Sequence, residues 1–208
     1  MTLSSSRKAL FLLFSVLLTT SLILVGCGPS DNPPPTTSAP PTTTAPSGPI
    51  AFTGNKYRNQ QTYNDIITVA TSNDDSRISV GIKARTTGWI AIALTPTLQK
   101  AGADLWMFTV DTDGNVTAID SYNPGYSGSH PSDTGYNGKN DLYDITGSEI
   151  NGITTIEFKR HLNTFESYDV RIVNGLNLFI WAIGASDNTF EEHSLLGFGE
   201  ITASIDHP

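Results

Sequence analysis

From residue 50 to the end of the chain, apolar and polar side chains alternate with a period of two, and helical periodicity is hard to find. Such alternation is typical of strands with one buried and one exposed face. Segments rich in β-branched and aromatic residues predict strands at 66–71, 77–83, 89–94, 105–110, 116–120, 142–146, 154–158, 178–183 and 195–205. Many short strands at this spacing predict an all-β antiparallel sandwich or barrel.

One turn between these segments carries polar oxygen ligands at alternate positions. Asp111, Asp113 and Asn115 superficially resemble a calcium-binding loop. An EF-hand loop needs flanking helices and a bidentate Glu at its twelfth position, where this chain has Tyr122. An Asp-Gly hairpin turn explains the same residues, so the sequence favours a turn over a calcium site.

The segment from Ser121 to Asn140 is rich in Gly, Ser, Tyr and Asn and has no periodicity. Structureless loops of about 20 residues are uncommon in compact domains and are usually functional or disordered. The segment contains His130, which precedes a proline, and a solvated polar residue is ordinary in such a loop. We therefore expect His130 to be exposed.

The first 27 residues are typical of an export signal. The basic pair Arg7-Lys8 precedes an apolar run over 9–25, which is short for a membrane span and suits a signal peptide. The run ends in Leu24-Val25-Gly26-Cys27, which looks like a bacterial lipobox. We expect acylation of Cys27 and a lipoprotein anchored in the cell envelope, outside the cytoplasm. An ordinary signal peptide with a chance Cys is the alternative.

Residues 28–49 contain eight Pro, five Thr and three Ser among 22 residues. Such a composition cannot bury a core, so it predicts an extended, solvated tether between the membrane and the rest of the chain. The remaining residues, 50–208, are the right number for one β-sandwich domain.

Charge and cysteine content exclude several classes of function. The chain has 12 basic and 20 acidic residues, and Arg7 and Lys8 leave with the signal. This acidic balance argues against nucleic acid or anionic lipid as a partner. Because Cys27 is the only Cys, no disulfide framework or Cys-rich metal site is expected.

The sequence offers little for nucleophilic catalysis. It lacks a Gly-x-Ser-x-Gly elbow, Cys27 is assigned to lipid, and the carboxylates are scattered over turns. A glycosidase pair, whose members meet only in space, stays open as the minority interpretation. Of the four histidines, His161 and His207 are expected at the surface. His193 follows an apolar strand, and either a binding role or a capping role fits its position.

Several motifs in order make the chain similar to the DOMON family. They are Gly88-Trp89-Ile90-Ala91-Ile92-Ala93-Leu94, Ala101-Gly102-Ala103-Asp104-Leu105, Asp120-Ser121-Tyr122, Phe158-Lys159-Arg160-His161-Leu162-Asn163-Thr164, Asp169, Ile180-Trp181-Ala182-Ile183-Gly184 and His193. Together they span most of residues 55–205. The resemblance implies an immunoglobulin-like antiparallel β-sandwich that binds haem b or sugars, and haem-binding members serve in electron transfer.

The resemblance also implies where a haem would be held. In haem-binding members the axial ligands are a late His, which His193 matches, and a Met shortly before the Gly-Ala-Asp motif. Lys100 stands about where that Met is expected, and Met107 lies three residues after Asp104. Lys100 is therefore the candidate second ligand. A free lysine has a pKa of about 10.4, so ligation by its amine needs burial or a nearby positive charge to remove the proton.

Three hypotheses follow from these observations. The leading one is a haem-binding electron-transfer lipoprotein that is not an enzyme, works with a redox partner protein and has a pocket lined by Trp89, Trp106 and Trp181. The alternative is a carbohydrate-binding module in which tyrosines of the long loop stack on sugar rings; those residues are Tyr122, Tyr126 and Tyr136. The third is an adhesion or scaffold domain with an empty pocket.

Overall fold

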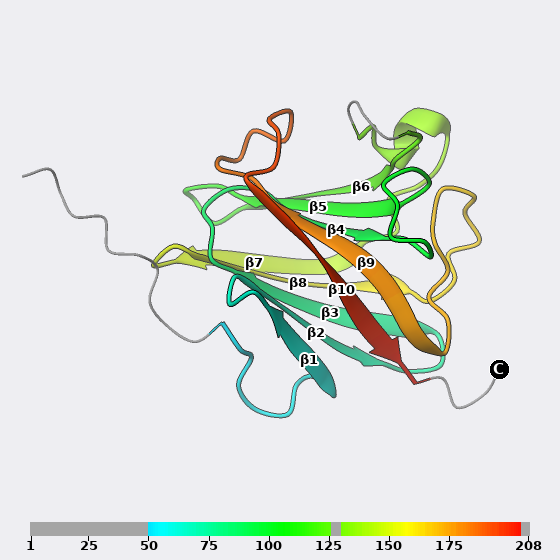
Figure 1. Ribbon diagram of the computed structural model, residues 1–208, viewed down its shortest axis with the longest axis horizontal. Helices are drawn as coiled ribbons and strands as arrows, with labels where there is room; N and C mark the ends of the chain where they lie inside the picture. The colour runs from blue at the N-terminus through cyan, green and yellow to red at the C-terminus, as the bar shows by residue number, and fades with distance from the viewer. Residues whose placement is uncertain (1–49, 126–129, 205–208) are drawn as a thin grey trace, which may run out of the picture. The chain divides into compact units, whose positions relative to one another are not determined.

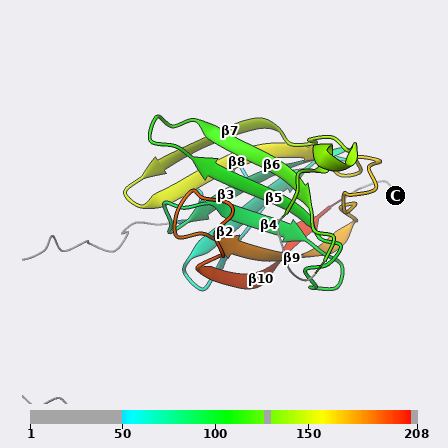
Figure 2. The same ribbon diagram turned by 90° about the horizontal axis from the view of Figure 1, so that it is seen from above.

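The computed structural model describes residues 50–125 and 130–204, and these residues form two antiparallel β-sheets (Figures 1 and 2). The elements are β1 (Asn59–Tyr63), β2 (Ile67–Asn73), β3 (Arg77–Ala84), β4 (Ile90–Leu94), β5 (Asp104–Val110), β6 (Val116–Tyr122), the short 3-10 helix η1 (Asp133–Tyr136), β7 (Tyr143–Ile150), β8 (Ile153–His161), β9 (Gly175–Ile183) and β10 (Leu195–Ala203).

The two sheets pack face to face as a sandwich. The first sheet has the order β1-β2-β3-β8-β7, and the second has the order β10-β9-β4-β5-β6. One hydrophobic core fills the space between them, and its largest apolar members are Trp106, Trp181, Phe108, Phe158 and Phe179. The predicted all-β antiparallel sandwich is therefore confirmed.

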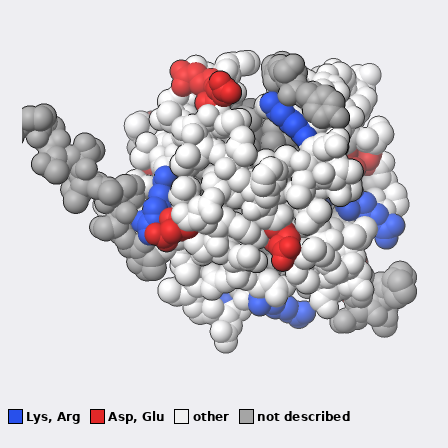
Figure 3. Space-filling model, in the orientation of Figure 1, with Lys and Arg blue, Asp and Glu red and all other residues white. Residues whose placement is uncertain are grey.

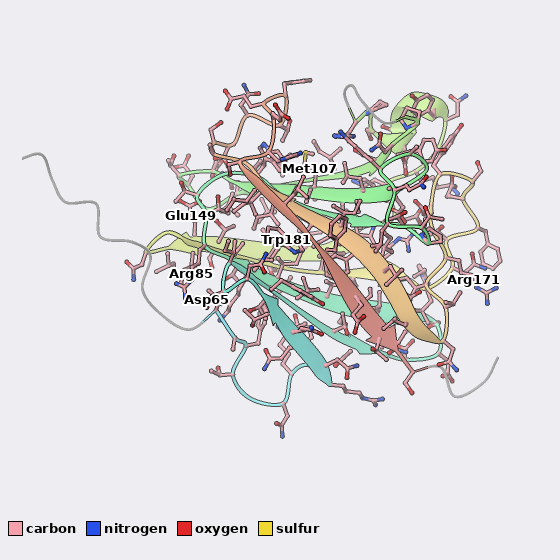
Figure 4. The ribbon with its side chains drawn as sticks, viewed as in Figure 1. Asp65, Arg85, Met107, Glu149, Arg171 and Trp181 are labelled. Carbon is pink, nitrogen blue, oxygen red and sulfur yellow. The ribbon has the colours of Figure 1, made fainter. Side chains whose placement is uncertain are left out.

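Period-two alternation decides which face each residue of the second sheet occupies. On β5, Trp106 and Phe108 belong to the core between the sheets, whereas Leu105 and Met107 belong to a second apolar cluster on the outer face. Both faces of the second sheet are thus apolar, in contrast to a sheet whose outer face is fully solvated. Figure 4 labels Met107 and Trp181, which lie on opposite faces.

The sequence pattern missed one strand. β1 has the sequence NQQTY and is mostly exposed, so it lacks the apolar alternation that marks the other strands. It forms because Asn64 and Asp65 both adopt positive φ values, 52° and 55°, which suit the tight hairpin turn into β2. The predicted last strand is shorter in the structure and ends at Ala203.

The Asp111–Asn115 segment is a hairpin turn, as its sequence predicts. The Asp111 carboxylate accepts hydrogen bonds from the backbone N–H groups of Asp113 and Asn115, at 2.9 and 2.8 Å. These bonds hold the pKa of the Asp111 carboxyl below its usual value, with the Asn115 side-chain amide as the largest cause. The Asp111 carboxylate therefore accepts hydrogen bonds within the turn, as a hairpin-turn residue does.

Several predicted features lie outside the described residues: the signal peptide with Cys27, the tether at 28–49, Tyr126 and His207. Over residues 50–125 and 130–204, no helix is both long and apolar enough to cross a membrane.

Candidate functional site

A groove with a cavity volume of about 260 Å³ lies on the outer face of the second sheet. Its lining consists mainly of apolar side chains with a few nitrogen donors. The lining residues are Trp89, Ala91, Ala93, Leu98, Lys100, Leu105, Met107, Asn123, His130, Ile180, Ala182, His193, Leu196 and Phe198.

Strand register explains why a groove forms here. Two rows of outward-facing residues cross the sheet: Met107, Ala91, Ala182 and Leu196 form one row, and Leu105, Ala93, Ile180 and Phe198 form the other. On the central strands β4 and β9, Ala91, Ala93 and Ala182 are small, whereas Ile180 and the residues on β5 and β10 are larger. The alanines therefore form the floor of the groove, and the larger residues form its walls.

Trp89 closes one end of the groove. Its side chain is 4% exposed and lies over Gly184, where any side chain would collide with the indole. The backbone of Gly184 also donates to the Trp89 carbonyl at 2.7 Å. His193 lies at this same end, because Ser194 follows it and bonds to Ile183, the last residue of β9. The indole N–H of Trp89 is buried and has no hydrogen-bond partner.

Lys100 and His130 reach the groove from loops at the other end of the sheet. Lys100 belongs to the loop from β4 to β5, and His130 is held beside the end of β6, where its carbonyl accepts a bond from the Ser121 hydroxyl at 3.5 Å. Figure 1 shows that the loop between β9 and β10 and the loops after β4 and β6 project at opposite ends of the sheet. These loops bring three nitrogen-bearing side chains to one groove, and His193 lies near enough to His130 for its charge to act on that imidazole.

The surroundings of His130 in the groove change its pKa. Burial lowers the pKa of His130 below its usual value, and the positive charges of Lys100 and His193 lower it further. Its Nδ1 atom is buried without a hydrogen-bond partner. A neutral imidazole with an unpartnered nitrogen is available to bind a metal or to accept a hydrogen bond.

The structure brings together most of the site residues that the sequence indicated. Trp89, Lys100 and His193 all line the groove. Trp181 does not line it, and neither does Trp106: both are buried in the core between the sheets. The reason is alternation, since Ile180 and Ala182 face the groove and the residue between them must face inward.

Sequence reasoning missed two groove residues. The expectation that His130 is solvent-exposed is wrong, because the long loop folds back and leaves it half-buried against the groove. The sequence motifs indicate Lys100, not Met107, as the candidate ligand. The alternation of side chains along β5 nevertheless places Met107 on the outer face with Leu105. The alternation of inward and outward side chains along the strand could have identified Met107 from the sequence. The position of His130, in contrast, depends on long-range packing.

Two tyrosines of the long loop, Tyr122 and Tyr136, do not line the groove. The ring centroids of Tyr122 and Tyr136 each lie 5.4 Å from that of Tyr168, and neither residue lines the groove. Their role in the described structure is loop packing. They therefore do not form the sugar-stacking platform of the alternative hypothesis at this site.

Comparison with known proteins gives similarities of fold. The cytochrome domain of Myriococcum thermophilum cellobiose dehydrogenase is similar at a TM-score of 0.49 and 14% identity, over 67% of this chain and 76% of that chain. A family 9 carbohydrate-binding module from Caldicellulosiruptor kristjanssonii in complex with glucose is similar at a TM-score of 0.33 and 11% identity, over 59% of this chain and 61% of that chain. No curated protein matches the chain in sequence. The DOMON domain family matches residues 61–184, more than half of the chain, and the protein therefore belongs to the DOMON family.

Proposed function

We propose that the groove binds haem b and that the protein takes part in electron transfer outside the cytoplasm, as a lipoprotein anchored at Cys27. The observation that carries this proposal is the donor set: imidazoles from His193 and His130 and the amine of Lys100 line one apolar groove. Histidine nitrogen and methionine sulfur are the usual protein ligands of a six-coordinate haem iron, and an apolar surround suits the macrocycle.

The size of the groove fits a partly exposed macrocycle. Its volume of about 260 Å³ lies just below the range of ordinary ligand pockets, roughly 300–1,000 Å³. A porphyrin would therefore keep one edge in solvent.

Three further side chains of the groove could hold the iron together with His193. If His193 is one ligand of a bound haem, Lys100, His130 and Met107 are the candidates for the second. Lys100 occupies the position of the family methionine, but its amine must lose a proton before it can bind iron. His130 binds as a neutral base, and burial already favours that form by lowering its pKa. We therefore rank His130 ahead of Lys100, with Met107 as the sulfur alternative on the β5 wall.

Bound haem would supply a one-electron redox centre. The chain's own residues would exclude water from the groove and present its edge to a partner protein. Large apolar side chains on the rim are exposed: Leu98 by 37%, Leu196 by 45% and Phe198 by 56%. Figure 3 shows that few charged side chains lie on the face in front of β9 and β10. An exposed apolar rim of this kind is typical of a protein interaction site.

The test is the absorption spectrum of the protein expressed with ample haem. We expect a red protein with the Soret band of low-spin, six-coordinate iron. His193→Ala should lose that signature, whereas His161→Ala, which removes an exposed imidazole on β8, should keep it. His130→Ala, Lys100→Ala and Met107→Leu then identify the second ligand, since only one of them should change the spin state.

A Soret spectrum that survives His193→Ala would exclude the proposed site. A colourless protein that takes up no hemin and binds cello-oligosaccharides instead would establish the carbohydrate alternative. A protein that binds neither would be the scaffold domain with an empty pocket.

Anchoring has its own test, because Cys27 and the tether lie outside the described residues. Cys27→Ala should release the protein from the membrane fraction without changing its thermal unfolding midpoint, since the acyl chains supply about 0.8 kcal/mol of membrane affinity per buried CH₂. Sedimentation of the variant with membranes after a high-salt wash would contradict the lipobox interpretation.

A further inference from the structure

A second group of polar side chains lies between the sheets, at the end of the sandwich where β5 begins. One carboxylate oxygen from each of Asp104, Asp120 and Asp169 lies within 4.8 Å of the others. Asp104 and Asp120 are fully buried, and the Asp169 side chain is 1% exposed. These residues come from β5, β6 and the loop after β8, so the fold itself brings them together.

Arg160 on β8 supplies one positive charge to this group. Its Nη2 atom lies 2.7 Å from Oδ2 of Asp104 and 3.2 Å from Oδ2 of Asp169, and its side chain is fully buried. The guanidinium carbon also lies 5.4 Å from the centroid of the Trp106 ring. Arg160 thus pairs with two carboxylates, Asp104 and Asp169, but its single positive charge balances only one negative charge of the group.

A fourth carboxylate points into the group from η1. Asp133 is 1% exposed, and neither of its oxygens has a hydrogen-bond donor. It lies against the Asp169 carboxylate, close enough for a hydrogen bond when one of the two carboxyls carries a proton. Because η1 belongs to the long loop after β6, this contact is independent of the strands that place Asp104 and Asp120.

In the described part of the chain, several oxygens of these carboxylates are buried and accept no hydrogen bond. Those buried without a hydrogen-bond partner are Oδ1 of Asp104, Oδ1 of Asp120, both oxygens of Asp133 and both oxygens of Asp169. A buried acceptor without a donor costs about 1–3 kcal/mol, and more when it is charged. Such a concentration of unpaired anionic oxygens in one interior therefore requires protons, ordered water or a cation.

We propose that the carboxylates of Asp104, Asp120, Asp133 and Asp169 bind a single Ca²⁺ ion. Calcium takes 6–8 oxygen ligands in flexible geometry, whereas Mg²⁺ demands a near-ideal octahedron and usually keeps several of its waters. The group offers many carboxylate oxygens in a dehydrated interior, which favours the larger ion. With Arg160, one divalent ion brings the four carboxylates close to neutrality.

The ion would fasten the long loop to the sandwich. Asp133 and His130 lie on the same loop, three residues apart, and the backbone N–H of Asp141 donates to Oδ2 of Asp120 at 2.8 Å near the loop's other end. A cation shared by Asp133 and the strands therefore holds the segment that carries His130 to the groove. This inference does not depend on haem binding.

The experiment is calcium titration of the full chain after treatment with EGTA, followed by calorimetry and by the thermal unfolding midpoint. We expect one binding site per chain, a rise in the midpoint that saturates with binding, and at least tenfold weaker binding of Mg²⁺. Asp133→Asn should weaken Ca²⁺ binding at least tenfold. Asp113→Asn, which removes the same charge from the exposed hairpin turn, should leave binding unchanged.

Asp120→Asn provides a second variant, since the amide oxygen can still accept the Asp141 N–H if Asp133→Asn fails to fold. Wild-type protein that shows neither binding heat nor a shifted midpoint would overturn the proposal, and so would equal affinity for Mg²⁺. Loss of binding in Asp113→Asn would move the site to the turn and would also overturn it.

Discussion

The groove and the carboxylate cluster differ in chemistry although the same strand builds both. On β5, the outward residues Leu105 and Met107 belong to the groove, while the inward residues Asp104 and Trp106 belong to the interior. The groove is apolar, open on one side and has few unpartnered polar atoms. The cluster is sealed and concentrates anionic oxygens around Arg160.

This difference separates ligand binding from stability. A substitution in the open groove changes what binds there but removes little packing, because solvent or ligand already occupies the space. A substitution in the sealed cluster leaves charges without compensation, and the folded state then loses stability directly. The two regions should therefore respond to mutation in opposite ways.

The largest effect is expected at Arg160. Arg160→Met removes the only basic side chain that pairs with Asp104 and Asp169 in the described structure, and breaking a buried ion pair in this way costs about 3–5 kcal/mol. Urea unfolding measures the loss. Lys159→Met, on the same strand but in an exposed pair with Asp144, should change the free energy of unfolding by less than about 1 kcal/mol. Equal losses in the two variants would contradict the comparison.

The inner and outer faces of the second sheet give the next contrast. Trp181→Ala empties a fully buried site in the core and should cost about 3–5 kcal/mol. Phe198→Ala removes a large side chain from the groove wall, but that side chain is 56% exposed, so the loss should stay near 1 kcal/mol. Chemical denaturation of both variants checks the ranking, and a larger loss for Phe198→Ala would reverse the assignment of faces.

A bulky residue on the floor should block the groove at a moderate cost in stability. Ala93→Phe projects from the second row into the groove, but Ala93 is only 9% exposed and belongs to the apolar cluster of Leu105 and Met107, so the free energy of unfolding should fall by about 1–3 kcal/mol. The same change occupies the space of the ligand and should weaken hemin binding at least tenfold. If hemin binds Ala93→Phe as tightly as wild type, the groove is not where haem binds.

The pH dependence of the metal-free protein tests the carboxylate cluster by itself. Burial raises the pKa of Asp120 to about 7 and that of Asp133 to about 7, from 3.8 for the ordinary carboxyl. Between these values the native state holds more protons than the unfolded state, so stability falls as pH rises through this window. In EGTA, the unfolding midpoint should be higher near pH 5 than near pH 8. Saturating Ca²⁺ should remove most of this fall, because the ion replaces the protons.

The strands of the sandwich could be predicted because they depend on local sequence patterns. Alternation and turn chemistry give the strands from β2 to β10, but the polar hairpin strand β1 carries no such pattern. The family motifs indicated that Trp89, Lys100 and His193 belong to one site, and all three line the groove. The alternation of side chains along β5 and β9 could also have assigned Met107 and Trp181 to opposite faces of the sheet. His130 and the cluster around Arg160 could not be predicted, since both depend on how loops distant in sequence pack against the strands.

The most direct test is a hemin titration followed in the Soret region for wild type, His193→Ala and Asp120→Asn. The account predicts that wild type and Asp120→Asn develop the same low-spin band with affinities within about threefold, while His193→Ala loses the band. Retention of the band in His193→Ala, together with its loss in Asp120→Asn, would contradict the assignment of haem to the outer groove.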